Sequence, residues 1–175
     1  MPYAVELALD DASAAIVREL WRRVADAGFP FMAESGAHPH VSLAIWDDVD
    51  RAAITRRLHD FARDTTPIDV VLAAVASFPT TGVLFLALEE HRGLREIQRR
   101  CHAMLAPHGR AAWPHYAPDV WVPHCTLGMD LSEALPRVRA QVEPARLPLS
   151  GRLERAELVE FRPVRHLVAA PLAGR

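Results

Sequence analysis

The sequence of 175 residues contains no lysine, and all 20 of its basic residues are arginine. Phosphate-binding loops of the Walker type need a lysine, and so do enzymes that form a Schiff base with their substrate. The absence therefore excludes both kinds of site. It also excludes ATP-dependent nucleotidyl transfer through an adduct on lysine.

The sequence also has few cysteines, no long apolar run and a net charge close to zero. Cys101 and Cys125 are the two cysteines, and they form no Cys-x-x-Cys pair. No apolar stretch approaches the roughly 20 residues of a membrane span, and the start lacks the pattern of a signal peptide. We therefore expect a cytoplasmic, monomeric protein with reduced thiols. The net charge of −2 predicts that any contact with nucleic acid is local and small.

Half of the residues are hydrophobic, which suits a single domain over residues 1–175 made of two lobes. Alternating apolar residues predict strands at 3–9, 40–46, 68–78, 83–88, 121–128, 147–161 and 165–170. The turn of the central hairpin is predicted at 79–82. Each half thus reads as strand, helix, pairing strands and helix. This order predicts an α+β fold with two pseudo-symmetric antiparallel sheets that line a central cleft, and helices packed outside.

Four helices are predicted between the strands. The first is capped by Asp10 or Asp11, and the last by Ser132. The positions expected to face the core follow helical spacing. They are Ile16, Leu20, Val24 and Ala27 in the first helix, Ile54, Leu58 and Phe61 in the second, Leu94, Ile97, Cys101 and Leu105 in the third, and Leu135, Val138 and Val142 in the fourth. Residues 31–38 and 107–118 are expected to be loops.

One short pattern occurs twice, in segments that are nearly half the chain apart. Residues 39–44 read Pro-His-Val-Ser-Leu-Ala, and residues 123–128 read Pro-His-Cys-Thr-Leu-Gly. Side chains at positions i and i+2 of a strand share a face and lie about 6.5–7 Å apart. We therefore expect His40 to point the same way as Ser42, and His124 the same way as Thr126, beside Gly128. The two lobes would bring these strands face to face.

The two motifs together offer the groups that phosphodiester chemistry needs. Neutral histidine has a pKa near 6.5, so it can take or give a proton near neutral pH. One of His40 and His124 could activate water while the other protonates the leaving oxygen. The hydroxyls of Ser42 and Thr126 could bind the non-bridging oxygens, where charge develops. These groups cover proton transfer and charge stabilisation, so we expect no metal and no cofactor.

The paired motifs resemble the 2H phosphoesterase superfamily, and most closely its branch of 2′-5′ RNA ligases and RNA 2′,3′-cyclic phosphodiesterases. The resemblance covers roughly residues 3–168. As in the family, the second motif is preceded by a run at 75–79, a strand at 83–88 and a helix that begins near Leu94. It implies that His40 is the general acid and His124 the general base. It also implies that Ser42, in place of the family's threonine, and Thr126 bind phosphate.

The resemblance implies a metal-independent phosphodiesterase. It would open a 2′,3′-cyclic phosphate at an RNA 3′ end to a 2′-phosphate, with weak 2′-5′ ligation in reverse. An alternative keeps the chemistry but acts on a small nucleotide, such as ADP-ribose cyclic phosphate or a 2′-5′ oligoadenylate. The weak overall charge favours this shorter substrate. A further alternative is a module that binds nucleotides or RNA ends without turnover, which the intact imidazole and hydroxyl pairs disfavour.

Further substrate contacts are predicted from residue type. A nucleotide base would stack on an aromatic or guanidinium plane. The candidates for the base are Trp46, Trp113 and Tyr116, and those for phosphate are Arg162, Arg165 and His166. Trp46 could equally pack in the core.

Three other patterns have simpler readings. His38 and His40 have the spacing of metal ligands, but no matching carboxylate cluster is evident in the sequence. The dipeptide His59-Asp60 is typical of a solvated helix face. Cys125 follows a histidine, yet on a strand it would point away from His124 into the core.

Overall fold

The computed structural model describes residues 1–78, 80–143 and 145–174. Its strands form one sheet in the order β5-β2-β1-β7-β3-β4-β6, and β8 pairs with β7 beside this path. Every pairing between these strands is antiparallel. The strands are β1 (Tyr3–Leu9), β2 (His40–Val49), β3 (Ile68–Phe78), β4 (Val83–Leu88), β5 (Gly109–Ala112), β6 (His124–Gly128), β7 (Leu149–Glu160) and β8 (Arg165–Pro171).

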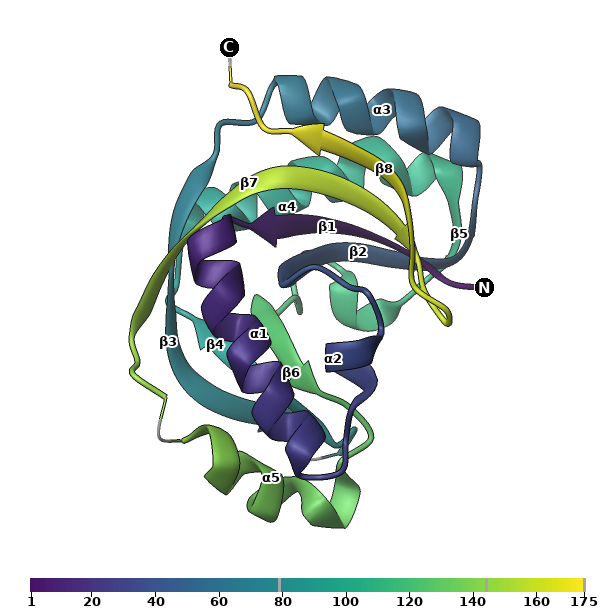
Figure 1. Cartoon of the computed structure of the whole chain (residues 1–175). Helices are drawn as coiled ribbons and strands as arrows, with labels where there is room; N and C mark the ends of the chain where they lie inside the picture. Colours follow the sequence, from purple (N-terminus) through teal and green to yellow (C-terminus); the bar gives the residue numbers. More distant parts are fainter. Residues whose placement is uncertain (79, 144, 175) are drawn as a thin grey trace.

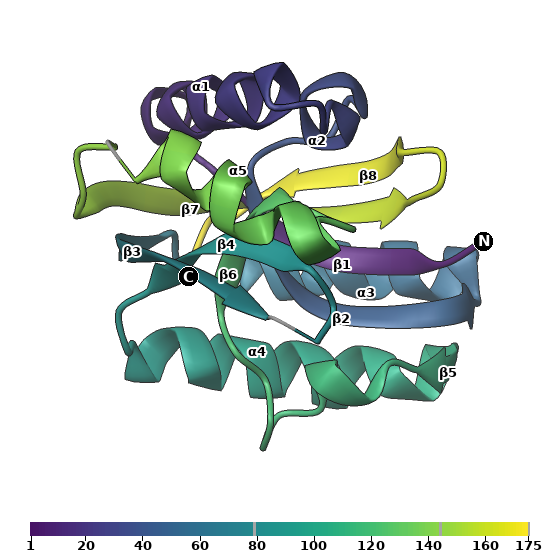
Figure 2. The same cartoon turned by 90° about the horizontal axis from the view of Figure 1, so that it is seen from below.

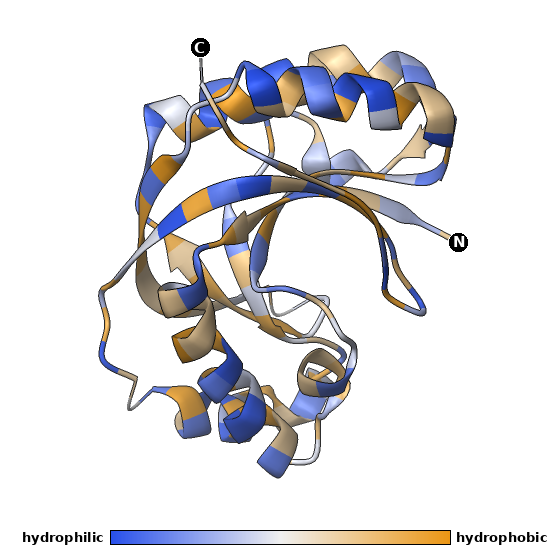
Figure 3. Cartoon of the chain, turned by 45° about the horizontal axis from the view of Figure 1, so that its top comes forward, coloured by the Kyte–Doolittle hydropathy of each residue, from blue (hydrophilic) through white to orange (hydrophobic). Residues whose placement is uncertain are grey.

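Helices cover the sheet from both sides. They are α1 (Asp11–Asp26), α2 (Phe31–Glu34), α3 (Arg51–Arg63), α4 (Arg92–Leu105) and α5 (Leu135–Val142). Figure 1 shows the sheet strongly curved, and Figure 2 shows α1 and α4 on opposite sides of the strands. Hydrophobic and hydrophilic residues alternate along the helices in Figure 3, as expected for helices with one face on the core. None of the helices described is long and apolar enough to cross a membrane.

The predicted α+β class with helices outside is confirmed, but the two predicted sheets are connected. The long strand β7 pairs with β3 near its start, where Leu149 lies opposite Leu72. Further along, it pairs with β1, where Glu160 lies opposite Tyr3. One strand therefore joins the half that holds β1 and β2 to the half that holds β3, β4 and β6. The hydrophobic pattern predicts strands but not which edges pair, so it could not show this connection.

The helix starts follow simple capping chemistry. The Asp10 side chain accepts hydrogen bonds from the backbone of the first turn of α1, and Asp50 does the same for α3. The predicted inner face of α3 is fully buried. That of α1 is wrong at Ile16, which is 47% exposed, because the buried stripe instead passes through Val17 and Trp21.

Several short elements lie where the sequence predicts loops or a different boundary. Helix α2 lies within the loop predicted at 31–38, and β5 within the one predicted at 107–118. Ser132 belongs to a short 3₁₀ helix (Ser132–Ala134), so it does not cap α5. The predicted turn at 79–82 includes Pro79, which lies outside the described residues. Short elements of this kind depend on tertiary contacts and carry little periodic signal.

Each copy of the repeated motif contains a β-bulge at its leucine. In β2, Ser42 pairs with Glu6 and Ala44 with Val5, so Leu43 is an extra residue between them. In β6, Thr126 pairs with Phe85 and Gly128 with Leu84, which makes Leu127 the extra residue. A bulge of this kind re-aims the side chains that follow it. The two copies of the motif thus share the same backbone irregularity as well as the same sequence pattern.

The bulges change which later residues share a face with the histidines. Beyond Leu43, Ile45 rather than Trp46 lies on the side of His40, and both Ile45 and His40 line one cavity. Beyond Leu127, a Cβ added to Gly128 would meet the side chain of Val24 at 3.1 Å, in the core. Trp46, a predicted candidate for stacking on a base, therefore does not share the face of His40, and the prediction that Gly128 lies beside His124 is wrong. In both strands a one-residue shift reverses the alternation.

The buried indole of Trp46 leaves no room for a side chain at Gly109. A Cβ added to Gly109 would lie 2.4 Å from two atoms of that ring, which is 1% exposed. We expect Gly109→Ala to destabilise the fold by about 1–3 kcal/mol, because a buried ring must move to make room. Thermal unfolding measures the loss. Gly93→Ala is the matched control: its added Cβ meets the side chains of His91 at 3.1 Å and Ile68 at 3.5 Å, and alanine favours the helix. Equal losses in both variants would contradict this account.

Candidate active site

A cavity of about 440 Å³ lies between the two halves of the molecule. Both motifs line it, with His40 and Ser42 on β2 and His124 and Thr126 on β6. The predicted side-chain directions at these four positions therefore agree with the structure. The volume falls within the range of pockets that bind one small molecule.

The two histidine rings are fixed by the same local hydrogen bond. Nδ1 of His40 lies 2.6 Å from the carbonyl oxygen of His38, and Nδ1 of His124 lies 2.7 Å from that of Val122. A proline stands between histidine and acceptor in both motifs. Because a carbonyl can only accept, Nδ1 carries the hydrogen in each ring. In the neutral ring, Nε2 is then left as the free proton acceptor.

Two tryptophans anchor the backbone of the motifs at equivalent points. The indole N–H of Trp121 donates to the carbonyl oxygen of Ser42 at 2.9 Å, and that of Trp21 donates to the carbonyl oxygen of Thr126 at 2.8 Å. Each acceptor directly precedes a bulge, where the ladder of backbone hydrogen bonds is disrupted. The indoles therefore hold the two hydroxyl-bearing residues in place. Sequence spacing gave no signal for either tryptophan.

Burial and mutual charge set the protonation of the two histidines. Burial lowers the pKa of His40, and the hydrogen bond to the His38 carbonyl opposes this only in part. Burial also lowers the pKa of His124, and the charge of His40 lowers it further. The two rings line the same cavity, and a proton on one disfavours a proton on the other. Such a pair suits one acid and one base.

The cavity walls are mostly apolar around these polar groups. The rings of Phe78 and Phe85 pack against His124, with centroids 5.3 and 5.2 Å away. Trp113 also lines the cavity, and its indole donates to Asp47 at 2.8 Å. Among the described lining residues, Arg162 is the one arginine. The site therefore offers aromatic surface but little positive charge.

Tyr116, one of the candidates for stacking on a base, lines the cavity together with Ser42. Burial raises the pKa of Tyr116 to about 12, against the influence of Ser42, so its hydroxyl stays neutral and can donate. The side chain of Gln98 donates to the carbonyl oxygen of Tyr116 at 2.9 Å and to that of Leu43 at 3.1 Å. Gln98 thus ties this loop to the first bulge. In the sequence, Gln98 stands next to the apolar positions of the predicted third helix, and this spacing could have identified it as a buried polar residue.

Three predicted substrate contacts do not line the cavity. One of them, His166, bonds Glu157 instead of serving as the predicted phosphate partner. The other two are Trp46 and Arg165. Trp46 is buried in the core against Gly109. The Arg165 side chain is 62% exposed and pairs with Glu160 at 3.7 Å. We therefore give neither residue a role in binding.

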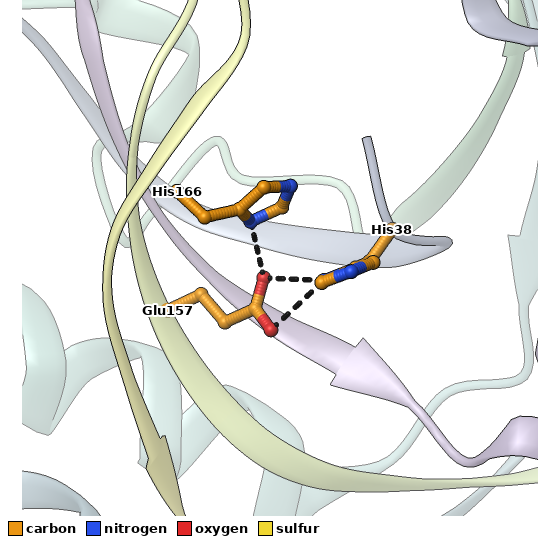
Figure 4. Close-up of side chains that lie close together, drawn as sticks. All are labelled: His38, Glu157 and His166. Atoms are coloured by element: carbon orange, nitrogen blue, oxygen red, sulfur yellow. Dashed lines mark hydrogen bonds and ion pairs between the residues drawn. The ribbon is translucent and has the colours of Figure 1, made fainter. Parts of the chain in front are cut away.

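His38, Glu157 and His166 form a charge network beneath the first motif. Figure 4 shows both imidazoles turned toward the Glu157 carboxylate, with Nδ1 atoms 2.9 and 3.0 Å from Oε2. Burial alone would raise the pKa of Glu157, but hydrogen bonds from Arg155 and His38 outweigh it, so the pKa lies below its ordinary value. Glu157 is the carboxylate near His38 that the sequence did not reveal.

The three side chains of this network are close enough to hold a cation. However, Nε of Arg155 already bonds Oε1 of Glu157 at 2.5 Å, and its guanidinium lies 3.5 Å from Nδ1 of His38. A fixed positive charge thus lies beside the same carboxylate and imidazole, and it disfavours a second cation there. We interpret the network as support for His38, whose carbonyl orients His40.

Comparison with known proteins gives a consistent family. A family model described as the 2′-5′ RNA ligase superfamily matches residues 9–164. A Geobacillus thermodenitrificans protein named as a candidate phosphoesterase is 30% identical over 100 residues, which make up 55% of this chain and 54% of that protein. The match therefore spans about half the length of this relative.

Solved structures share the fold over nearly the whole chain. TT0787 of Thermus thermophilus has a TM-score of 0.66 at 20% identity, with all of both chains covered. Escherichia coli LigT in its apo form has a TM-score of 0.60 at 18% identity, with 98% of both chains covered. LigT complexed with 3′-AMP has a TM-score of 0.54 at 19% identity, with 97% of this chain and 93% of that chain covered.

Proposed function

This chain belongs to the 2′-5′ RNA ligase superfamily, and we propose that it is a metal-independent phosphodiesterase that opens a 2′,3′-cyclic phosphate to a 2′-phosphate. One observation carries the proposal. Two imidazoles, from separate strands and fixed by the same backbone hydrogen bond, line one cavity, each with a hydroxyl two residues further on. This arrangement supplies an acid, a base and two donors around one phosphate.

The reaction follows from these groups. His124 accepts a proton from water at Nε2 as the water oxygen bonds to phosphorus. The bond between phosphorus and the ribose 3′-oxygen breaks, and that oxygen takes a proton from Nε2 of His40. The hydroxyls of Ser42 and Thr126 donate to the non-bridging oxygens while charge develops there. The assignment of acid and base rests on the family resemblance. A 5′-hydroxyl that attacks phosphorus in place of water, with the same loss of the 3′-oxygen, would give a 2′-5′ linkage.

A nucleotide-sized substrate is the second candidate, and the cavity walls favour it over long RNA. The described lining offers one arginine, Arg162, while Glu6 and Asp130 are acidic. A polyanion is usually bound by several basic side chains that neutralise its phosphates. Aromatic residues such as Trp113 and Tyr116 could instead stack on one base. The LigT structures complexed with 3′-AMP and with phosphate add support from relatives.

A panel of substrates tests both candidates. We expect cyclic mononucleotides and cyclic-ended RNA to be opened to 2′-phosphates in excess chelator, as measured by chromatography of the products. We also expect the mononucleotides to have the higher kcat/KM, with weak dependence on salt. Loss of activity on removing metal would contradict the mechanism. Nucleotide binding without any product would identify a binding module instead.

A further inference from the structure

Glu6 lies at the centre of the sheet and faces the cavity. Its strand β1 runs between β2 and β7, where Glu6 is directly opposite Ser42 on one side and Glu157 on the other. Residues directly opposite one another on paired strands share a face. Glu6 lines the cavity but is only 3% exposed. The alternation of 3–9 predicts a polar, solvent-facing position here, so this burial could not be predicted from the sequence.

The Glu6 carboxyl group stands beside the reactive nitrogen of His40. Its Oε2 lies 3.3 Å from Nε2 of His40, and its Oε1 is buried without a hydrogen-bond partner. Because Nδ1 of His40 already donates to the His38 carbonyl, neutral His40 presents a lone pair at Nε2. A lone pair and a carboxylate this close repel each other unless a proton lies on one of them.

The neighbouring Glu157 differs from Glu6 in its partners. Glu157 is held by Arg155, His38 and His166, which keep it ionised. Among the described residues, His40 is the one ion-pair partner of Glu6. Burial raises the pKa of Glu6 well above its usual value, and the charge of Glu157 raises it further, against the effect of His166. Paired carboxyls with such different surroundings divide into one ionised and one protonated group.

We propose that Glu6 is a positioning residue for His40: the carboxyl and imidazole retain one shared proton between Oε2 and Nε2 across neutral pH, so that His40 enters the reaction as an acid. The inference rests on the proposed phosphodiesterase. It answers a need of that mechanism, since a buried imidazole alone favours its neutral form and cannot serve as acid. In the reaction, the leaving 3′-oxygen takes the proton from Nε2, and His124 gains the proton of water. Exchange with solvent then restores both groups.

Other titratable groups also face Glu6 from the strands and loops around it. They are His40 on β2, Glu157 on β7, His166 on β8, Tyr116 in the loop before β6, and Cys125 on β6. Burial raises the pKa of Tyr116 and of Cys125 to about 12, so both stay neutral near pH 7. The proton near neutral pH is therefore shared by Glu6 and His40, within the field of Glu157 and His166.

The variant Glu6→Gln tests the proposal, because glutamine keeps the shape but cannot ionise. Without the carboxylate, His40 should lose its proton at lower pH. We expect the alkaline limb of the plot of kcat against pH to shift to lower pH by about one unit. At pH values on that limb, kcat would then be about tenfold lower than in the wild type. KM should change less, and Glu6→Asp should recover part of the shift. Glu160→Gln is the matched control, since this buried carboxyl bonds Tyr3 on the opposite face of the sheet.

An unchanged profile in folded Glu6→Gln would overturn the proposal. A second measurement needs neither a variant of Glu6 nor turnover. In labelled wild-type protein, NMR titration should show the Glu6 carboxyl and the His40 imidazole changing at the same pH midpoint. Separate midpoints would overturn the proton sharing. If the wild type instead showed no turnover of any cyclic phosphate, the proposed function would fail while this titration still decided the proposal about Glu6.

Discussion

Replacing His40 or His124 by alanine is expected to lower kcat roughly 10²–10⁴-fold, since each removes one proton transfer from the rate-limiting step. The double variant should be little worse than either single one, because acid and base act on the same transition state. Stopped reactions with a cyclic mononucleotide measure the losses, and circular dichroism checks the fold. His59→Ala, at an exposed position on α3, is the matched control and should keep wild-type rates.

The pH profiles of the single variants would assign the two roles. The acid limb of the wild-type profile should reflect loss of the base, and the alkaline limb loss of the acid. His124→Ala should flatten the acid limb, and His40→Ala the alkaline limb. The opposite pattern would exchange the two roles and leave the reaction intact. A normal rate in either variant would remove that histidine from the mechanism.

Removal of either hydroxyl should have the second largest effect. We expect Ser42→Ala or Thr126→Val to lower kcat about 10²–10³-fold, the cost of losing one donor to a developing oxyanion. KM should change less, since charge on the phosphate oxygens is greatest in the transition state. Ser42→Thr and Thr126→Ser are the matched variants, because each keeps the hydroxyl, and both should retain most activity. Equal losses in the matched variants would show that packing, not the hydroxyl, matters.

The sequence was sufficient to predict the centre of the candidate site. Two-residue alternation placed each histidine on the face of its hydroxyl-bearing neighbour, and both pairs line the cavity. The pattern worked here because His40 and Ser42 precede the bulge in β2, as His124 and Thr126 do in β6. Within these short segments the chain is regular, so local geometry alone decides direction.

Beyond these segments, long-range contacts decide the outcome. Trp46 lies in the core because a single extra residue, Leu43, reverses the alternation of side chains in β2. Glu6 and Glu157 became neighbours because β1 and β7, at opposite ends of the chain, pair in a particular register. No local pattern encodes such a register. The acidic groups around the first motif could therefore be found only from the folded chain.

The two tryptophan bonds join the N-terminal and C-terminal halves of the sequence. Trp21, in the N-terminal half, holds the backbone of Thr126, while Trp121, in the C-terminal half, holds that of Ser42. Each half thus supplies the brace that the other half's motif requires. If the repeat arose by duplication of an ancestral unit, that unit would have needed a second copy of itself to be complete. Neither half of the present sequence therefore contains every side chain that holds its own motif in place.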